Sequence, residues 1–327
     1  MTRPLTARRV QGRFGRGGVR WRFLAYAGGI VLLTAFRRRL RLPRPPMVPL
    51  VSTVPPAVAA AVPRGKYQYA AAWAAYVWLF KTAWEIPYDK PEKLTPRLHV
   101  DYPIRADSFL GAGAPPGERL QQGLRPGDRL TALDAAVTVV YYLLWLAPHG
   151  VLAWLLCFEP ERFPRAAGRL AAVYHFTTLG YWYLPTAPPW WASEQEGRMH
   201  GAVRHVTRDI ELAAKHALFG GSPLSDQDRR EADRDQGNPW GSMPSDALPS
   251  LAITARSLGE ISSAAGASGW ALTALDAFAL VYLGEHYVID LIVGLALVEL
   301  IWRAEPLALP LVRAAVSLLR GLERGAR

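Results

Sequence analysis

Apolar residues in this chain are gathered into blocks that alternate with polar and Pro/Gly-rich segments. A membrane-spanning helix needs about 20 mostly apolar residues. Six blocks approach or reach that length: 67–86, 133–158, 166–184, 248–265, 270–283 and 287–302. The block 133–158 contains Pro148 and Gly150, which predict a kinked helix. The pattern therefore predicts an all-α fold, a polytopic membrane helix bundle with a six-span core.

The segments on either side of this core have a different character. Residues 1–66 form a basic N-terminal region, with a short hydrophobic segment at 23–36 and a Pro-rich linker at 43–63. The short segment is interpreted as either a tilted extra helix or an interfacial anchor. Residues 67–303 form the transmembrane domain, and residues 304–327 form an amphipathic tail expected to lie along the membrane surface.

Charge is unevenly distributed along the chain. The net charge is +11, and residues 1–44 contain twelve arginines and no acidic residue. We expect the Arg/Gly-rich residues 1–22 to be disordered. No aromatic–basic surface recurs elsewhere, so nucleic-acid binding is not expected. The single cysteine, Cys157, excludes an intramolecular disulfide and a cysteine-rich metal site.

Basic residues in the short loops predict the orientation in the membrane, because such residues favour the cytoplasmic side. They are Arg162, Arg165, Arg169, Arg303 and Arg313. Segments 87–132 and 185–247 and the turn at 284–286 then lie on the extracytoplasmic side. The expected location is the cell membrane, with several passes and with these three segments outside.

Several polar features need their own interpretation. Residues 101–122 are too polar to span the membrane and predict either an interfacial helix that caps the bundle or a lid over a lipid headgroup. Residues 222–237 are expected to be a solvated loop without chemistry. Arg256 and Glu260 lie four residues apart and can satisfy each other or neighbouring helices.

Candidate chemistry begins with His286 and Asp290, which share one helix face at the start of the last span. A carboxylate there can fix the tautomer of the imidazole and raise its basicity, as in nucleophile–base pairs. The alternative is a histidine at a helix end with a neighbouring aspartate. These two residues alone do not decide between the two interpretations.

Two further segments meet the same membrane face. In residues 238–247, Ser245 follows Pro244 and can cap the helix that begins there. Free backbone N–H groups at that helix start can cradle a phosphate. Residues 183–191, Tyr-Leu-Pro-Thr-Ala-Pro-Pro-Trp-Trp, follow another span on this face.

This ordered set of motifs resembles the type 2 phosphatidic acid phosphatase superfamily, and most closely its branch related to inositol phosphorylceramide synthase. The match runs from about residue 101 to 302. That branch has Tyr–Pro–Thr–Ala–Pro–Pro–Trp, Met–Pro–Ser–x–His and Gly–x–His–Tyr–x–x–Asp segments. Their counterparts are residues 183–191, then Met243, Pro244 and Ser245, then Gly284, His286, Tyr287 and Asp290.

The resemblance implies a mechanism. His286 would attack the phosphorus of a lipid phosphate ester to give a phosphohistidine, with Asp290 orienting it. A histidine in the Pro–Ser segment would protonate the leaving oxygen and then activate water or an acceptor alcohol or polyol. No cofactor is implied. The phosphate-binding candidates are Ser245, Asn238, Gly284, Arg198 and Arg204.

The chain departs from the family pattern where that second histidine is expected, because Ala247 stands there. Alanine cannot transfer a proton, so acid catalysis worth about 10²–10⁴-fold should be missing. The neighbouring Asp246 is expected to point elsewhere. The usual Ser–Arg pair is Ala279 and Leu280, and the Lys and Arg–Pro of the first phosphatase motif are absent.

The missing phosphate-binding cations must come from other positions. Arg198 and Arg204 are the candidates, and the alternative is that both are ordinary loop cations. His200 and His205 are five residues apart, but no third ligand at helical spacing accompanies them, so no metal site is expected.

Three explanations of the site stay open. The first is an enzyme that hydrolyses or transfers the phosphoryl group of a lipid, and the second is a non-catalytic relative that binds lipid phosphate or acts as a scaffold. The third is that Ala247 replaces a natural histidine, in which case Ala247→His raises turnover by orders of magnitude. A transporter or channel is disfavoured, because ionisable residues gather at span ends on one face.

Overall fold

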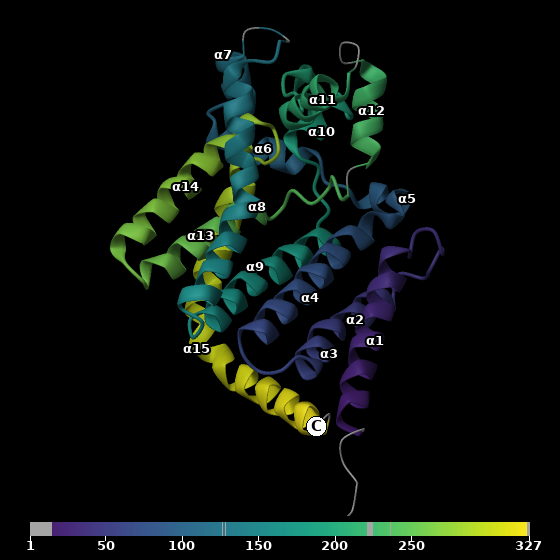
Figure 1. Ribbon diagram of the computed structural model, residues 1–327. Helices are drawn as coiled ribbons and strands as arrows, with labels where there is room; N and C mark the ends of the chain where they lie inside the picture. The colour runs from purple at the N-terminus through teal and green to yellow at the C-terminus, as the bar shows by residue number, and fades with distance from the viewer. Residues whose placement is uncertain (1–14, 126, 128, 221–224, 236, 326–327) are drawn as a thin grey trace, which may run out of the picture. The chain divides into compact units, whose positions relative to one another are not determined.

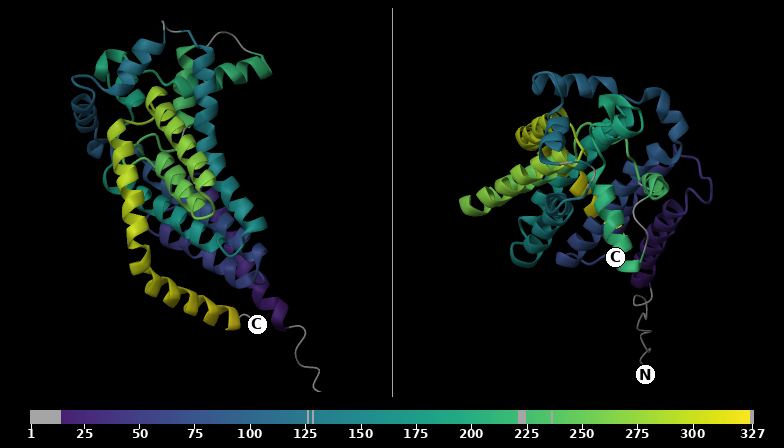
Figure 2. Two further views of the ribbon diagram at one scale, coloured as in Figure 1. Left: turned by 90° about the vertical axis from the view of Figure 1, so that its left-hand side faces the viewer. Right: turned by 90° about the horizontal axis from the view of Figure 1, so that it is seen from above.

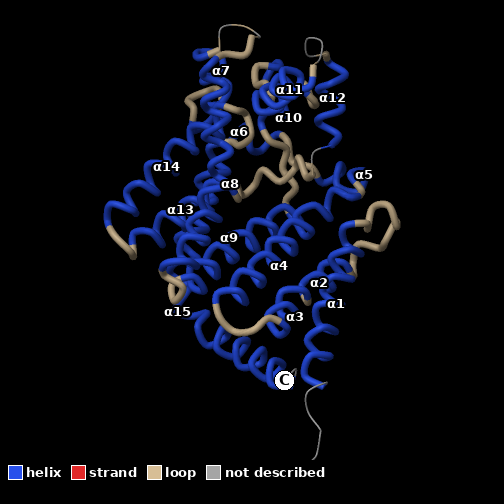
Figure 3. The backbone as a smooth tube through the Cα atoms, viewed as in Figure 1, coloured by secondary structure: helices blue, strands red, loops and turns tan. Residues whose placement is uncertain are grey.

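The computed structural model describes residues 15–125, 127, 129–220, 225–235 and 237–325. Over these residues the chain is helical and contains no β-strand, only two isolated backbone bridges (Figure 3). The predicted all-α class is confirmed. The chain forms two compact units, residues 80–306 in one and residues 1–79 with 307–327 in the other.

Most helices belong to the unit 80–306 (Figure 1). They are η1 (Ile86–Asp89), α5 (Pro91–Leu94), η2 (Thr95–Arg97), α6 (Asp101–Leu110), α7 (Pro116–Leu124), α8 (Ala132–Phe158), α9 (Phe163–Tyr183), α10 (Pro189–Glu194), η3 (Arg198–Gly201), α11 (Val206–Phe219), α12 (Asp226–Asp235), α13 (Ala247–Gly259), α14 (Ser263–Tyr282), and parts of α4 (Lys66–Glu85) and α15 (Val288–Gly325).

The other unit corrects the prediction of a Pro-rich linker at 43–63. This segment forms two short helices, α2 (Met47–Ser52) and α3 (Val54–Ala61), and both contact α1 (Gly15–Ala35). Proline is tolerated in the first turn of a helix, where its missing N–H costs no bond, and α3 has proline there. Of the residues 1–22 predicted to be disordered, 1–14 lie outside the described residues and 15–22 begin α1.

Two of the described helices, α8 and α14, are long and apolar enough to cross a membrane. The helix α8 begins with a capping box in which Thr131 and Asp134 exchange hydrogen bonds. The same Asp134 accepts a 2.6 Å hydrogen bond from the hydroxyl of Tyr282, at the end of α14. Asp134 therefore fixes the segment that leads directly to His286.

The predicted boundary between the fourth and fifth spans is wrong. The helix α13 has 13 residues and ends at Gly259, and α14 begins at Ser263, where Ser262 caps the N–H of Ala265. The two helices lie side by side as a hairpin (Figures 1 and 2). Thirteen residues extend about 20 Å, which is short of a membrane core of about 30 Å. The six-span topology stays a prediction.

The predicted break after residue 302 is also absent, because α15 continues from Val288 to Gly325. Residues 303–305, Arg-Ala-Glu, favour helix by intrinsic propensity. Glu305 is in addition held by Arg165, with an Nε–Oε1 distance of 2.6 Å, and by Arg169. The expected amphipathic tail is thus the end of one long helix.

A cluster of charged side chains joins α9, α13 and α15. Arg169 is buried and forms ion pairs with Glu260 at 2.7 Å and with Glu305 at 2.8 Å, and its guanidinium lies 3.8 Å from the ring centre of Trp302. Arg256 pairs with Glu299 on α15. Arg256 and Glu260 are therefore satisfied by neighbouring helices and not by each other.

Replacing Arg169 with leucine is expected to lower the free energy of unfolding by about 3 kcal/mol, because two carboxylates lose their shared partner. Thermal or denaturant unfolding of the purified protein measures this. The matched control is Arg165→Leu, since Arg165 has 59% of its side chain exposed and its pairs should contribute little. Equal losses of unfolding free energy in the two variants would contradict the role of Arg169 as the buried centre of this charged cluster.

Candidate active site

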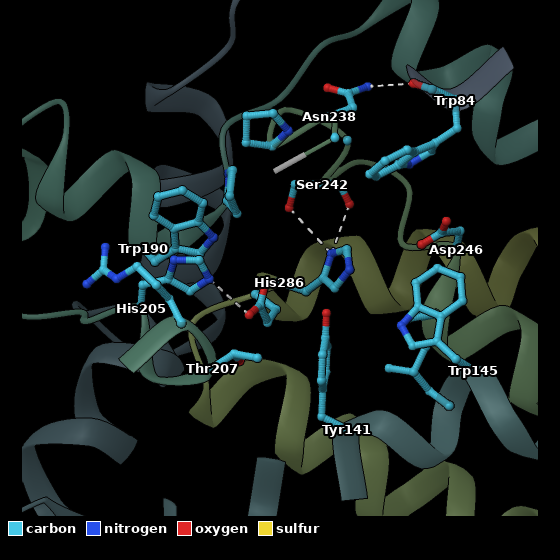
Figure 4. Close-up of a pocket in the computed structure, with 18 of the residues that line it drawn as sticks. Trp84, Tyr141, Trp145, Trp190, His205, Thr207, Asn238, Ser242, Asp246 and His286 are labelled. Carbon is cyan, nitrogen blue, oxygen red and sulfur yellow. Dashed lines mark hydrogen bonds and ion pairs between the residues drawn. The ribbon is translucent and has the colours of Figure 1, made fainter. Parts of the chain in front are cut away.

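A cavity of about 260 Å³ lies in the unit 80–306 and is bounded by α8, α11 and the loops before α13 and α15 (Figure 4). His286, Ala247 and Asn238 line it. The remaining lining residues include Trp84, Tyr141, Trp145, Trp190, His205, Arg208, Glu211, Ser242, Asp246 and Glu285. The structure thus brings residues of all three sequence motifs to one pocket, because Pro188 and Trp190 of the segment 183–191 also line it.

The imidazole of His286 is held through Nδ1. This nitrogen lies 3.0 Å from the carbonyl oxygen of Ser242 and 3.4 Å from Asp290 Oδ2. A carbonyl oxygen can only accept, so Nδ1 carries the proton and donates it. Nε2 is therefore unprotonated in the neutral ring and is the nitrogen available to a ligand in the pocket.

Ser242 stands between the two residues of the predicted pair. Its hydroxyl donates a 2.5 Å hydrogen bond to Asp290 Oδ2, and its carbonyl oxygen is the nearest acceptor for His286. Asp290 is completely buried, and its Oδ2 also accepts from the N–H of Tyr287 at 2.9 Å. Asp290 thus orients His286 both directly and through Ser242, which sequence reasoning did not single out.

The start of α15, which carries Asp290, is capped from another helix. Both carboxylate oxygens of Asp107 on α6 accept hydrogen bonds, from the N–H of Val288 at 3.0 Å and from that of Ile289 at 2.9 Å. A carboxylate favours the positive end of a helix. The segment 101–122 therefore supports the loop of His286, and none of its residues lines the pocket.

Gly284 allows the backbone of the His286 loop to turn. Its φ is +79°, a conformation that favours glycine. A Cβ atom there would lie 2.9 Å from Val203 Cγ1. Its carbonyl oxygen accepts from the N–H of Trp190 at 3.1 Å. Gly284 does not line the pocket, so its visible role is to allow the turn and not to contact a phosphate.

The segment 183–191 connects the loops of the two other motifs. The N–H of Thr186 donates to Trp240 O at 2.9 Å, and the N–H of Ser242 donates to Thr186 O at 3.3 Å. Trp190 then binds Gly284, as described above. This segment therefore holds the Ser242 loop and the His286 loop against each other.

Ser245 and Asn238, both predicted to bind phosphate, have structural partners. Ser245 is fully buried, and its hydroxyl accepts from the N–H of Leu248 in the first turn of α13 at 3.4 Å, although the N-cap position itself is held by Asp246. The Asn238 amide donates to Trp84 O at 3.1 Å and accepts from the N–H of Trp240 at 3.1 Å. Of the two, only Asn238 lines the pocket.

The structure contradicts the expectation that Asp246 points elsewhere. Asp246 is the residue immediately before α13, and its side chain lines the pocket beside Ala247. Helix periodicity does not govern a residue at the N-cap, which explains the error. Burial raises the pKa of Asp246 above its usual range, and the charge of His286 and the hydroxyl of Tyr181 oppose this less strongly.

The pocket cation is Arg208, not Arg198 or Arg204. Arg198 is half-exposed and pairs with Asp101, while Arg204 pairs with Glu194, and neither lines the pocket. Arg208 is almost fully buried on α11. Sequence reasoning missed it because its partners come from distant segments.

Arg208 belongs to a buried ionic network. It binds carboxylates of Glu194 at 2.8 Å, Asp209 at 3.0 Å and Asp233 at 3.0 Å. Asp233 lies on α12, so the segment 222–237, expected to be a solvated loop, contains a helix that contributes a buried charge. Residues 222–224 and 236 of that segment lie outside the described residues.

His205 completes the network. Its Nδ1 lies 3.4 Å from Asp233 and its Nε2 lies 3.4 Å from Glu285, while its ring stacks on Trp190 at 3.9 Å. Burial lowers the pKa of His205, but the charge of Glu285 and the hydrogen bonds with both carboxylates outweigh burial and raise it to about 9. These contacts favour the charged form of His205, whose charge is balanced by Asp233 and Glu285.

No cluster of three or more His, Cys, Asp or Glu side chains that could hold a metal ion occurs in the part of the chain that the structure describes. His200 does not line the pocket, although His205 does. The two histidines that are five residues apart in the sequence therefore do not share a site, since His205 lies in the pocket wall and His200 lies outside it.

Fold and site together define a helical protein with a buried histidine–carboxylate pair and an accessible imidazole nitrogen. The family profile of the PAP2 superfamily matches residues 128–304, which is more than half of the chain. The chain belongs to the PAP2 superfamily. No curated protein and no solved structure matches it. Membership suggests activity of the phosphatase or phosphotransferase type, and with two candidate spans it is consistent with a membrane protein.

Proposed function

We propose that this protein is an integral-membrane lipid phosphatase or phosphotransferase that works through a phosphohistidine on His286. The observation that carries the proposal is the hydrogen bond from His286 Nδ1 to Ser242 O, which leaves Nε2 as the nucleophile in the pocket. Asp290 and Ser242 restrict the ring to the tautomer that the attack requires.

The first step transfers the phosphoryl group from lipid to protein. The Nε2 lone pair forms a bond to phosphorus, the bond between phosphorus and the lipid oxygen breaks, and the lipid oxygen takes up a proton. In the second step the oxygen of water or of an alcohol attacks phosphorus and loses its proton, and His286 is released. With water the reaction is hydrolysis, and with an alcohol or polyol it is transfer.

The proposed setting is a six-span membrane core with the pocket on the extracytoplasmic leaflet. The basic residues of the predicted cytoplasmic loops support this orientation. Arg165 and Arg169 lie near one end of α9, and the pocket-lining Pro188 follows its other end. The three sequence motifs favour the branch of the superfamily related to inositol phosphorylceramide synthase.

The second candidate is a non-catalytic relative that binds a lipid phosphate. One observation favours it: Ala247, which lines the pocket at the position expected for histidine, has no proton to transfer. The catalytic proposal is preferred because His286, Ser242 and Asp290 retain a geometry that binding alone does not require.

The two candidates differ in turnover. Purified protein in mixed micelles with phosphatidic acid or a polyprenyl phosphate should release inorganic phosphate, or pass the phosphoryl group to added polyol. Both products are measured with radiolabelled phosphate. Saturable lipid binding without either product, in a folded sample, would favour the binding protein.

A further inference from the structure

The pocket has no proton donor at the position where the superfamily pattern places a histidine. Ala247 is the first residue of α13 and lines the pocket with a methyl group. An alkoxide leaving from phosphorus is strongly basic, so the transfer needs a nearby acid. Another side chain of the pocket must therefore supply this proton.

Asp246 has the required position. Its side chain lines the pocket with Ala247 and His286, and only 7% of the residue is exposed. Its Oδ2 is buried and has no hydrogen-bond partner among the described residues. Buried carboxylate oxygens are nearly always paired. This oxygen is itself inaccessible from the pocket, and leaving it unpaired costs least when the carboxyl group is protonated and neutral.

Electrostatics support a protonated Asp246. Burial raises the pKa of this carboxyl, as described above, and no ion pair with Asp246 is found among the described residues. The arginine of the pocket, Arg208, is already bound by three other carboxylates. A neutral carboxyl group can donate a proton to a leaving oxygen, which an ordinary ionised aspartate cannot do.

Three other ionisable groups of the pocket have partners of their own, whereas the Tyr141 hydroxyl lies beside His286 (Figure 4) and is the competing proton donor. His205 has both ring nitrogens directed at carboxylates, and its partner Glu285 is thereby held in an ion pair. Glu211 accepts a hydrogen bond from the hydroxyl of Tyr142. In Figure 4, His205 and Asp246 are drawn on opposite sides of His286. Asp246 therefore lies away from the ionic network.

We propose that Asp246 is the acid–base residue of this site and replaces the histidine that is missing at Ala247. The proposal rests on the proposed function of His286. When Nε2 attacks phosphorus, the Asp246 carboxyl gives its proton to the lipid oxygen as the phosphorus–oxygen bond breaks. The resulting carboxylate then takes a proton from the water or alcohol that attacks the phosphohistidine. One turnover thus returns both residues to their starting state.

This role of Asp246 changes the expected result of Ala247→His. From the sequence alone, that substitution should raise turnover by orders of magnitude. With Asp246 already acting as the acid, the gain in the parent protein should be less than about 10-fold, since the second acid duplicates the first. The full effect of Ala247→His should appear only when Asp246 is disabled.

The test compares leaving groups that differ in their need for a proton. Asp246→Asn is expected to lower phosphorylation of His286 by a lipid phosphate about 10²–10⁴-fold. With nitrophenyl phosphate the loss should be less than about 10-fold, because nitrophenolate leaves without protonation. Adding Ala247→His to Asp246→Asn should restore turnover of the lipid. The matched control is Asp226→Asn, an exposed carboxylate outside the pocket, which should match the parent.

Four outcomes would overturn the assignment. The first is full lipid turnover by Asp246→Asn. The second is an equal loss of His286 phosphorylation with the lipid and with nitrophenyl phosphate, together with no recovery of lipid turnover when Ala247→His is added. The assignment also fails if His205→Gln or Tyr141→Phe, and not Asp246→Asn, shows the dependence on the leaving group. Finally, absence of phosphohistidine in the parent protein with either substrate would overturn the proposed function itself. Unfolding temperatures identify variants that are merely unstable.

Discussion

Replacing His286 with glutamine is expected to lower turnover of a lipid phosphate by about 10⁶-fold, the scale on which loss of a catalytic nucleophile acts. Glutamine is similar in size and can still donate a hydrogen bond to the carbonyl oxygen of Ser242. It cannot form the covalent intermediate. Steady-state release of phosphate from lipid in mixed micelles measures the effect.

Lipid binding by this variant should change little, since the aromatic wall and Arg208 are intact. A binding measurement on the same sample therefore separates a lost nucleophile from a collapsed pocket. The role of His286 is contradicted if the folded variant retains more than a small fraction of the parent rate. His200→Gln, at a histidine outside the pocket, is the matched control and should keep the parent rate.

Replacing Asp290 with asparagine is expected to lower turnover by about 10⁴-fold, as when the orienting aspartate of a catalytic triad is changed to asparagine. The amide can present its N–H₂ group to Ser242 or His286, and this permits the wrong histidine tautomer. Phosphate release in micelles measures the rate.

The effect of Asp290→Asn should fall on the chemical step and leave lipid affinity nearly unchanged. Ser242→Ala should cost less, because His286 Nδ1 still donates to the carbonyl oxygen at residue 242. A smaller loss of turnover for Asp290→Asn than for Ser242→Ala would contradict the proposal that Asp290 contributes more than the Ser242 side chain to orienting His286.

The sequence predicted the catalytic pair, but not how its two members meet. The shared helix face is wrong, because His286 lies in the loop before α15, which begins at Val288, and Ser242 links its ring to Asp290. The superfamily pattern marked the position of Ala247 as that of a second catalytic histidine, and the structure places Ala247 in the same pocket as His286. The hydrogen bond of Ser245 with the first turn of α13 was likewise predictable, since it depends on the next few residues.

The pocket wall could not be predicted in this way. Arg208, His205 and Asp233 are brought together by packing of α11 against α12, and no spacing in the sequence encodes that contact. Asp233 was assigned to a solvated loop because sequence gives composition but not burial. Ser242 was missed for a related reason, since part of its contribution comes from a backbone carbonyl group that any residue would supply.

Helix boundaries were predicted well only where hydrophobic blocks end at clear signals. The block 133–158 matches α8 closely because Thr131 caps its start. The hairpin of α13 and α14 was divided wrongly because moderately polar residues continue through both helices. There Gly259 and Ser262, not hydropathy, set the turn.

The most direct test of the central claim is to trap and locate the covalent intermediate. The full-length protein is mixed with ³²P-labelled lipid phosphate, quenched within the first turnover, and mapped by peptide mass spectrometry. We predict label that is labile in acid and stable in base, located on His286 and absent from His286→Gln. Turnover of the lipid without such label, or label that persists in His286→Gln, would contradict the account.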